Sequence, residues 1–427
     1  MTGNMASTST ATFPSVADFV QQISSRPFPV NAPRLAIGNP AGDADSIICA
    51  IGTAYVDTTL RHLSTVPVVS IPLPDLQSLR PETKYLFSLA GIHTDTLDYS
   101  SIMAIDDPAG LPDVASVTLV DHNQLTLSKD GWKVEEILDH HMDEGVHTDT
   151  CQGKDRMIAY DAASLSALVA SSCTLTVEQW DKHAPSSPSS MGIGAIPPSL
   201  SILLLGVILL DSINLSTKAG KATERDKWAV ETLRRHTDWS ALNLPAEICV
   251  DGKAGGSPDP TKLFDTLQSQ KFQPEFWNGL TALQALKLDY KSFNVGENGG
   301  SSPMTFGVSS VLQSMSEFLR KPDICKSLAE NYFPELKLFG IMFMTVGGGA
   351  AERQIMLASP DESMLQKLVQ FLQQEDTLRV GEVGWNRDDK TRLFTVSMEQ
   401  GNAKASRKQV VPILMDFFRK SSGDVAQ

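Results

Sequence analysis

An aspartate followed by two histidines stands in the middle of the chain, directly after an apolar segment. Asp139, His140 and His141 follow Ile137 and Leu138, where a buried strand would reach the edge of a sheet. Carboxylate and imidazole groups held side by side can bind a divalent cation or exchange protons with a substrate. An isolated group of this kind can also lie on the surface without any function, so its interpretation depends on what accompanies it.

Four further aspartates also stand where apolar segments end. They are Asp43 and Asp45 after residues 34–38, Asp121 after residues 117–120, and Asp211 after residues 202–210. Open α/β sheets bind their ligands at the carboxyl ends of the strands, so these side chains are expected to meet. Oxygen ligands suit Mg²⁺ and Mn²⁺, and imidazole suits Mn²⁺ and other transition metals. We therefore predict one shared site for two divalent cations, with the alternative that Asp43 or Asp45 only caps the helix that follows.

A site of this composition is suited to phosphoryl hydrolysis. Two cations about 3.5 to 4 Å apart can hold a hydroxide between them and stabilise both ends of an in-line displacement at phosphorus. A structural zinc site would instead favour cysteine ligands, and none of the five cysteines stands in a CxxC spacing.

The segments around these residues predict the α/β fold that would position them. Short apolar segments alternate with helical patterns, and each predicted strand ends in a polar cluster, which indicates a mostly parallel sheet flanked by helices. The predicted strands are 33–38, 66–71, 102–105, 114–120 and 132–138, and the predicted helices are 16–23, 47–55, 160–172 and 199–210. A capping box from Thr223 to Asp226 predicts the start of a further helix. Asp106 and Asp107 precede a proline and are interpreted as turn residues.

The length of 427 residues exceeds what one core usually supports, so two domains are expected. Residues 251–260 are rich in glycine, proline and polar side chains, as linkers are. We predict a metal-binding domain at 1–245, a linker at 246–261 and a smaller mixed α/β domain at 262–427. The predicted elements of this second domain are strands at 304–311, 338–346 and 392–397, and helices within 261–287, at 311–319, at 364–373 and at the C-terminus.

The composition excludes several classes of partner. The formal net charge of -14 argues against binding to nucleic acid or to anionic membranes, because both require an extensive basic surface. The first 15 residues contain no lysine or arginine, so no targeting signal is predicted. The longest apolar run, Leu200 to Leu210, is shorter than the roughly 20 residues that a membrane span requires. With its scattered cysteines, the chain is predicted to be cytoplasmic. Pro185 to Pro198 is interpreted as an inserted loop.

Six ordered stretches of the sequence resemble the motifs of a known family. Four of them resemble, in order, the motifs of the DHH phosphoesterase superfamily: Asn39-x-x-x-Asp43-x-Asp45-Ser46, Leu119-Val-Asp121-His122-Asn123, Asp139-His140-His141 and Asp211-Ser-Ile-Asn214. Two later ones resemble the DHHA2 domain shared by eukaryotic exopolyphosphatases, family II inorganic pyrophosphatases and prune-type proteins: Asp289-Tyr-Lys291-x-Phe293 and Ser406-Arg407-Lys408-Gln409. The resemblance covers nearly the whole chain and implies a DHH domain followed by a substrate-binding DHHA2 domain.

The resemblance also implies a role for each aspartate and histidine. Asp43 would bind one cation, Asp45, His140 and Asp211 would bind the other, and Asp121 would bridge both. His141 would face the substrate and either bind phosphate or donate a proton to the leaving oxygen. Asp139 would orient an imidazole.

In the second domain, the resemblance implies that cationic side chains bind the phosphate groups. Lys291, Arg407 and Lys408 would neutralise phosphate oxygens, with bidentate geometry at the arginine. Closure of the two domains over the end of the substrate chain would exclude water. The alternative for Ser406, Arg407 and Lys408 is the solvated start of a helix.

Asn39 distinguishes among the members of this family. Family II pyrophosphatases have histidine where this chain has Asn39, whereas fungal-type exopolyphosphatases resemble it in having asparagine. Asn39 would contact substrate, coordinate a cation through its amide oxygen, or orient a neighbour, and these alternatives stay open. Gly347 to Gly349 resembles a glycine triplet of the other DHH subgroup, whose members cleave short nucleic acids, but Ala350 replaces the histidine that follows there. We interpret this triplet as a turn.

The predicted function is a metal-dependent exopolyphosphatase that releases orthophosphate from the end of linear polyphosphate. It would use in-line attack of a hydroxide held between Mg²⁺ or Mn²⁺ ions, with His141, Asp121 and Asp139 as catalytic groups. The enzymatic alternative is an inorganic pyrophosphatase, or a prune-like hydrolase of short polyphosphates or nucleotides. A phosphate sensor or scaffold without catalysis would be expected to lack some of the metal carboxylates, and all four are present. We expect a monomer or a weak oligomer.

Overall fold

The computed structural model describes residues 13–24, 34–69, 79–93, 103–104, 112–125, 129–174, 196–295, 304–347 and 350–421. The chain divides into two compact units, Met1–Gln270 and Lys271–Gln427. The linker predicted at residues 246–261 lies within the first unit, because the helix α9 (Pro260–Lys271) buries Leu263 and Leu267 in the first unit's core.

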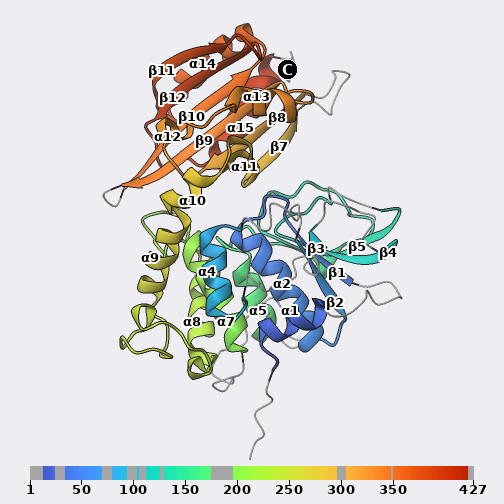
Figure 1. Ribbon diagram of the computed structural model, residues 1–427. Coiled ribbons are helices and arrows are strands. Elements are labelled where there is room, and N and C mark those ends of the chain that lie inside the picture. The colour runs from blue at the N-terminus through green and yellow to red at the C-terminus, as the bar shows by residue number, and fades with distance from the viewer. Residues whose placement is uncertain are drawn as a thin grey trace, which may run out of the picture. The chain divides into compact units, whose positions relative to one another are not determined.

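The first unit contains a parallel sheet (Figure 1). Its described strands are ordered β3-β2-β1-β4-β5-β6, and all neighbours pair in parallel. The strands are β1 (Arg34–Gly38), β2 (Thr65–Val69), β3 (Met103–Ala104), β4 (Val114–Val120), β5 (Gly131–Asp139) and β6 (Arg156–Ile158). The chain runs outward from β1 on one side and resumes at β4 on the other, so the strand order reverses between β1 and β4. Open α/β sheets bind ligands at the carboxyl ends of strands at such a switch point.

The side chains of this sheet alternate between two buried clusters, because successive residues of a strand point to opposite faces. Leu35 and Ile37 of β1 pack with Val117 of β4 on one face. Ala36 of β1 and Val120 of β4 belong to the cluster on the other face. Burial on both faces explains why these strands read as continuous apolar segments.

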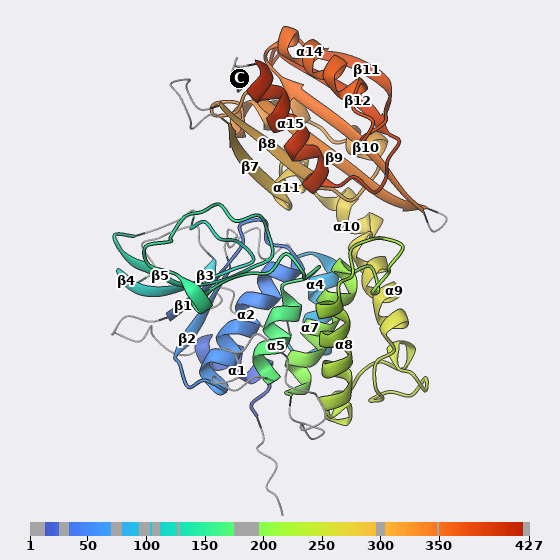
Figure 2. The same ribbon diagram turned by 180° about the vertical axis from the view of Figure 1, so that it is seen from behind.

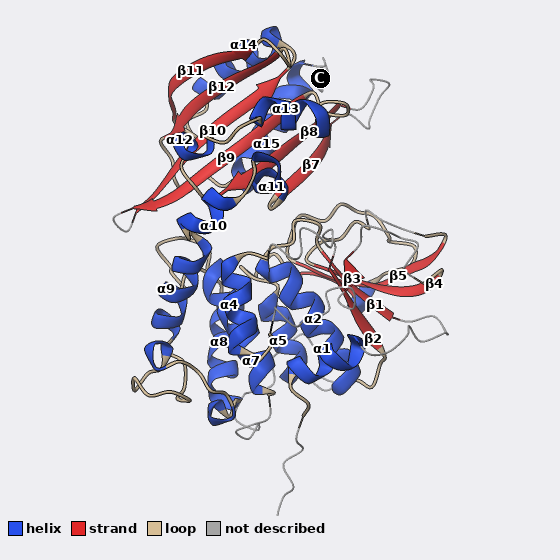
Figure 3. Ribbon diagram, viewed as in Figure 1, coloured by secondary structure: helices blue, strands red, loops and turns tan. Residues whose placement is uncertain are grey.

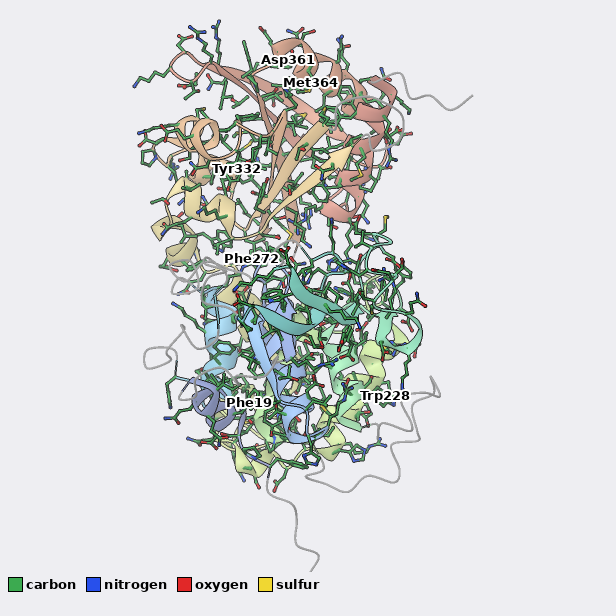
Figure 4. The ribbon with its side chains drawn as sticks, turned by 90° about the vertical axis from the view of Figure 1, so that its right-hand side faces the viewer. Phe19, Trp228, Phe272, Tyr332, Asp361 and Met364 are labelled. Carbon is green, nitrogen blue, oxygen red and sulfur yellow. The ribbon has the colours of Figure 1, made fainter. Side chains whose placement is uncertain are left out.

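The helices of the first unit gather on one side of the sheet, as opposite views show (Figures 1 and 2). They are α1 (Val16–Ser24), α2 (Ala44–Thr59), α4 (Pro81–Leu89), α5 (Ser166–Thr174), α7 (Pro198–Asp211), α8 (Glu224–His236) and α9, with 3₁₀ turns η2 (Gly153–Asp155), η4 (Trp239–Ala241) and η5 (Ala246–Ile248). Phe19 of α1, labelled in Figure 4, packs edge to face on Tyr55 of α2 with ring centroids 5.4 Å apart. The predicted capping box is confirmed: Thr223 accepts from the backbone of Asp226, whose side chain accepts in return.

A mixed sheet forms the centre of the second unit (Figure 3). Its described strands are ordered β11-β12-β10-β9-β8-β7. Only β8 and β9 pair in parallel among these described strands. The strands are β7 (Tyr290–Val295), β8 (Met304–Val311), β9 (Leu338–Gly347), β10 (Ala350–Ser359), β11 (Val380–Asp388) and β12 (Leu393–Gln400). The three predicted strands are found as β8, β9 and β12, whereas β7, β10 and β11 were not predicted.

Helices cover both faces of this second sheet. The described helices are α10 (Pro274–Gly279), α11 (Ala282–Lys287), α12 (Met315–Phe318), α13 (Ile324–Asn331), α14 (Glu362–Gln373) and α15 (Arg407–Ser421). Leu365 of α14 and Leu414 of α15 pack on one face, while Leu328 of α13 packs with Phe339 of β9 on the other. Tyr332, labelled in Figure 4, continues this second layer, with its ring centroid 4.5 Å from that of Phe339.

Two predicted helices differ from the structure. The helix predicted at 160–172 begins only at Ser166, because the turn before it is held by side chains of the candidate site. The helix predicted at 311–319 is reduced to α12, because Val311 still belongs to β8. The fold class is confirmed: a parallel sheet with helices, followed by a smaller mixed α/β unit.

Some predictions fall on residues outside the described part of the chain. They are the turn at residues 106 and 107 and all but the last residues of the loop at 185–198, where Pro198 already begins α7. Residues 348 and 349 of the glycine triplet predicted as a turn also lie outside it. In the described part, the structure contains no helix with the length and apolar character of a membrane span.

Gly38 permits the close approach of α2 to the end of β1. A Cβ on Gly38 would lie 2.8 Å from Ser46 Oγ and 3.0 Å from the backbone oxygen of Ser46. The Ser46 hydroxyl is itself engaged, because it donates to the backbone oxygen of Asn39 at 3.0 Å. Any larger residue at this position must therefore push the start of α2 away from the strand.

We predict that Gly38→Ala lowers the free energy of unfolding by about 1–3 kcal/mol, the usual cost of overpacking. Urea unfolding of the full chain measures this change. Gly384→Ala in β11 is the control, because nothing lies within 4 Å of a Cβ placed there. Equal stability of Gly38→Ala and wild type would contradict the predicted steric role.

Candidate metal centre

Three neighbouring strands bring predicted ligands to the same edge of the first sheet. β4 lies between β1 and β5. Asn39 follows β1, Asp121 follows β4, and β5 ends with Asp139 before His140 and His141. Because the strands are parallel, these residues leave the sheet at the same edge.

Asp121 is buried and has an unusual backbone conformation. Its φ is 67°, a left-handed value that costs a non-glycine residue on the order of 1–3 kcal/mol. Two hydrogen bonds hold it there: its backbone N–H donates to Leu138 O at 2.9 Å, and the side-chain amide of Asn39 donates to its backbone oxygen at 2.9 Å. The strands on both sides of β4 therefore fix the position of Asp121.

The Asp121 carboxylate meets both histidines. Its Oδ1 lies 3.3 Å from His140 Nε2 and 3.6 Å from His141 Nδ1, and the three side chains form a group whose ligand atoms lie within 4.8 Å of one another. Burial and the charge of Asp43 raise the pKa of Asp121 to about 7, although the contact with His140 opposes this shift. A bound cation would relieve this repulsion between neighbouring carboxylates.

His140 presents Nε2 to the carboxylates. Its Nδ1 lies 3.1 Å from the backbone oxygen of Ala162, and since a carbonyl only accepts, Nδ1 carries the hydrogen. Nε2 then has the lone pair and lies 3.9 Å from Asp45 Oδ2 as well as 3.3 Å from Asp121. This is the tautomer that a metal ligand requires, with the hydrogen bond on the opposite nitrogen fixing the ring.

His141 is paired with Asp139 instead. Its Nδ1 lies 2.9 Å from Asp139 Oδ1, and the same oxygen accepts from the backbone N–H groups of His140 and His141. Burial by itself would raise the pKa of Asp139, but the hydrogen bond and charge of His141 and the hydrogen bond from Asn123 outweigh it, so the pKa lies well below its ordinary value. Asp139 therefore stays ionised and orients His141, whose side chain is 30% exposed.

Asn123 is a site residue to which the sequence assigned no role. Its side-chain amide donates to Asp139 Oδ2 at 2.6 Å and to Met142 O at 2.9 Å, and its oxygen accepts from the backbone of Glu144 at 2.8 Å. It thus joins the loop after β4 to the loop after β5. Its place in the Leu119 to Asn123 motif is the signal that could have identified it.

Asp43 and Asp45 differ in their surroundings. Asp43 is the N-cap of α2 and accepts from the backbone of Ser46 at 2.9 Å, while a cation contact of Asp43 stays a prediction. Its charge also acts on Asp121, which places it near the cluster. Asp45 is buried and turns toward the residues that begin α5.

Asn39 is buried, and both ends of its amide are engaged within the loops. Its nitrogen donates to Asp121 O, and its oxygen accepts from the backbone N–H of Ala41 at 2.9 Å. These contacts correspond to the predicted alternative in which Asn39 orients a neighbour. A substrate or cation contact for Asn39 stays a prediction.

Asp211 is the last residue of α7 and precedes a strained turn. Ile213, Asn214 and Leu215 all have φ between 51° and 55°, which is rare for a β-branched residue such as Ile213. The turn is fixed by a hydrogen bond of 2.7 Å from the backbone N–H of Asn214 to Leu209 O. Participation of Asp211 in the metal centre stays a prediction.

The predicted phosphate-binding residues of the second unit include one close pair. Arg407 begins α15 and donates to the backbone oxygen and to Oδ1 of Asp289, both at 2.8 Å. Two motif stretches that are far apart in the sequence therefore meet. Lys291 lies in β7 and is half-buried, and Lys408 is exposed; phosphate binding by all three cations stays a prediction.

The residues of the first unit fit a divalent cation. Oδ1 of Asp121 is a buried carboxylate oxygen without a hydrogen bond of normal geometry within the described residues, although two imidazole nitrogens lie close to it. Carboxylate oxygens and a neutral imidazole are the donors that Mg²⁺ and Mn²⁺ accept. The identity of the metal stays a prediction.

Comparison with known proteins agrees with these features. A family model of the DHHA2 domain matches residues 266–417. The chain is 25% identical over 395 residues to exopolyphosphatase PRUNE1 of Mus musculus, covering 90% of this chain and 74% of that protein. It is 28% identical over 400 residues to a provisionally named exopolyphosphatase of Schizosaccharomyces pombe, covering 90% of each. The predicted resemblance to DHH phosphoesterases with a DHHA2 domain, of the fungal exopolyphosphatase type, is confirmed.

One solved structure also matches over most of its length. The pGpG-specific phosphodiesterase PggH of Vibrio cholerae is 11% identical, with 90% of this chain and 98% of that chain covered and a TM-score of 0.20. A superposition of this quality carries no weight, so the fold rests on the strand order described above.

We predict that cation binding to the metal-free protein releases protons near neutral pH. Folded Asp121 keeps its proton up to about pH 7, whereas an unfolded aspartate loses it near pH 4. The stability that this proton contributes is therefore present below about pH 4 and is lost as the pH rises to 7. A cation must displace the same proton, so its affinity should fall about tenfold for each pH unit below 7.

Titration calorimetry of Mn²⁺ in buffers with different heats of ionisation measures the released protons. The control is the same titration at about pH 9, where Asp121 is already ionised and its proton should no longer be released. Cation binding without proton release at pH 6.5 would contradict the assigned pKa of Asp121.

We also predict that Asn123→Ala loosens the Asp139 and His141 pair. Turnover should fall by about 10–100-fold, the usual effect of removing a partner that orients a site residue, and the pH profile of the rate should shift because His141 loses its fixed orientation. Loss of the buried partner should cost about 1–3 kcal/mol of stability. The control is Asn331→Ala, an exposed amide in α13 that donates to Ser327 O. An unchanged pH profile in Asn123→Ala would refute the positioning role.

Proposed function

We propose that this chain, which carries a DHHA2 domain and is related to proteins named exopolyphosphatase, is a hydrolase of phosphoanhydride bonds. Its substrate would be linear polyphosphate, from whose end it would release orthophosphate. The observation that carries the proposal is the cluster of Asp121, His140 and His141 at the switch point of the sheet. The names of the relatives support the substrate class.

The chain's carboxylates would form the cation site. The proposed ligands are Asp43, Asp45, Asp121, His140 and Asp211. Two bound Mg²⁺ or Mn²⁺ ions would neutralise phosphate oxygens. They would also lower the pKa of a bound water molecule, so that it can lose a proton near neutral pH. The protein would hold these ligands in fixed positions. The hydrogen bonds that join Asp121 to the strands on either side of it support this role.

His141 would exchange the proton at the leaving oxygen. Asp139 accepts its Nδ1 hydrogen bond at 2.9 Å, so the proton to be donated would sit on Nε2. The ionised Asp139 stabilises the imidazolium form and prevents the ring from turning. This gives Asp139 and His141 a shared role that does not require Asp139 to contact substrate.

Cationic side chains of the second unit would bind the phosphate groups away from the bond that breaks. Arg407 is held by Asp289 in a fixed orientation, and such a guanidinium can recognise phosphate with little further loss of side-chain freedom. Lys291 and Lys408 would act as point charges. These contacts would favour a chain of phosphates over a single anhydride.

We predict that wild-type protein with Mg²⁺ or Mn²⁺ releases phosphate from long polyphosphate faster than from pyrophosphate or a cyclic nucleotide. Phosphate release from the three substrates, measured side by side with each metal, tests this. Asp121→Asn should reduce every rate by more than about 100-fold without unfolding the protein, because the central cation ligand is lost.

Turnover of pyrophosphate alone would identify a pyrophosphatase, and turnover of the nucleotide alone would identify a prune-like nucleotide hydrolase. Either result would overturn the polyphosphatase proposal. Absence of turnover on all three substrates would leave a binding protein.

A further inference from the structure

The side chain of Asp45 is surrounded by hydrogen-bond donors from the residues that begin α5. Its Oδ1 accepts from Ser164 Oγ at 3.0 Å, from the backbone N–H of Ser166 at 3.0 Å and from Ser166 Oγ at 2.8 Å. Cys49 Sγ lies 3.2 Å from the same oxygen. Oδ2 accepts from the backbone N–H of Leu165 at 2.7 Å. Ser164, Leu165, Ser166 and Cys49 have no exposed surface.

The two oxygens of Asp45 are therefore unequal. A carboxylate offers about four lone-pair sites in total, two on each oxygen. The donors around Oδ1 use both of its sites, whereas the single donor on Oδ2 leaves one. Only Oδ2 can then serve as a ligand to a cation.

The remaining site on Oδ2 faces the candidate metal centre. Oδ2 lies 3.9 Å from His140 Nε2, which is too far for a hydrogen bond. Two atoms that each bind one Mg²⁺ ion at about 2.1 Å can be at most about 4.2 Å apart. The separation of 3.9 Å lies within that limit, so both atoms can bind one small cation.

We propose that Ser164 and Ser166 are positioning residues that force Asp45 to bind its cation through Oδ2 alone, and thereby select small octahedral cations over Ca²⁺. Ca²⁺ takes more oxygen ligands than Mg²⁺ and commonly binds a carboxylate through both oxygens, whereas Mg²⁺ and Mn²⁺ are satisfied by one. A carboxylate whose Oδ1 is occupied cannot supply the extra ligand. The proposal rests on the proposed function in one respect, the assignment of Asp45 as a cation ligand.

The test measures cation binding to the metal-stripped full chain by titration calorimetry, with Mn²⁺ and Ca²⁺ in separate titrations. In the double variant Ser164→Ala with Ser166→Ala, Mn²⁺ binding should weaken about 10–100-fold. The double variant leaves on Oδ1 only the backbone N–H of Ser166 and the thiol of Cys49, which is a weak donor, so one site of Oδ1 opens. Ca²⁺ binding should therefore be unchanged or stronger, and the preference for Mn²⁺ should fall at least about tenfold. The matched control is Ser172→Ala, which removes a buried hydroxyl on the same helix that donates to Leu168 O at 3.2 Å.

Unchanged Mn²⁺ and Ca²⁺ affinities in the double variant would overturn the proposal, as would an equal loss of both. If the double variant does not fold, the double variant Ser164→Cys with Ser166→Cys decides by the same ratio, because its thiols fill similar space but are weaker donors to Oδ1.

The variant Asp45→Asn distinguishes the role of Asp45 as a ligand from the positioning role of the serines. Loss of Mn²⁺ binding in Asp45→Asn with a wild-type preference in the serine variants refutes the positioning role alone, whereas unchanged Mn²⁺ binding in Asp45→Asn refutes Asp45 as a ligand. A wild-type protein that binds Mn²⁺ selectively but hydrolyses no phosphate compound would refute the proposed function and leave the serine proposal standing.

Discussion

The crowding of negative charge at the carboxyl ends of β1 and β4 is the constraint on which the structure of the first unit depends. Two like charges about 4 Å apart repel by about 4 kcal/mol at an effective dielectric constant of about 20, several times the value of a typical hydrogen bond. The pKa of Asp121 rises to about 7 from burial and the charge of Asp43. Such an arrangement is stable only if groups with positive or partial positive charge offset it. Each acidic residue has its own: the backbone N–H groups at the start of α2 for Asp43, those at the start of α5 for Asp45 and, when they are protonated, the two imidazoles for Asp121. These groups reduce the repulsion without removing it, and a divalent cation is the remaining partner that the chemistry of the site calls for.

Rigidity in this site comes from hydrogen bonds that cross between loops. Asn39 joins the loop after β1 to the backbone of Asp121, and Asn123 joins the loop after β4 to Asp139. Both amides are buried, so breaking either one would leave polar atoms without partners. The bond from Asn39 helps Asp121 to keep a left-handed backbone conformation that the local sequence alone would not favour.

Much of this arrangement could be predicted from the sequence, because aspartates at the ends of apolar segments follow directly from the physics of parallel sheets. The strands β1, β4 and β5 and the pairing of acidic residues with His140 and His141 were predicted in this way. The different roles of the two histidines could not be predicted from the sequence. They depend on the contact of His140 with the backbone oxygen of Ala162 and on the contact of His141 with the Asp139 carboxylate. The strand β11 was missed because its residues are mixed in polarity and mostly exposed, and β10 was missed because only its second half, residues 355–359, is buried. Nor could the contacts of Ser164 and Ser166 with Asp45 be foreseen, since they join residues more than a hundred positions apart.

The most direct test of a site built to hold cations is to count them. Equilibrium dialysis of the metal-stripped chain against Mn²⁺ at pH 8, where Asp121 is ionised, gives the number of ions bound by wild type and by Asp121→Asn. Two ions per wild-type chain, with loss of binding in the variant, is the expected result. Absence of bound Mn²⁺ in wild type, or equal binding by both proteins, would contradict the assignment of this cluster as the metal centre.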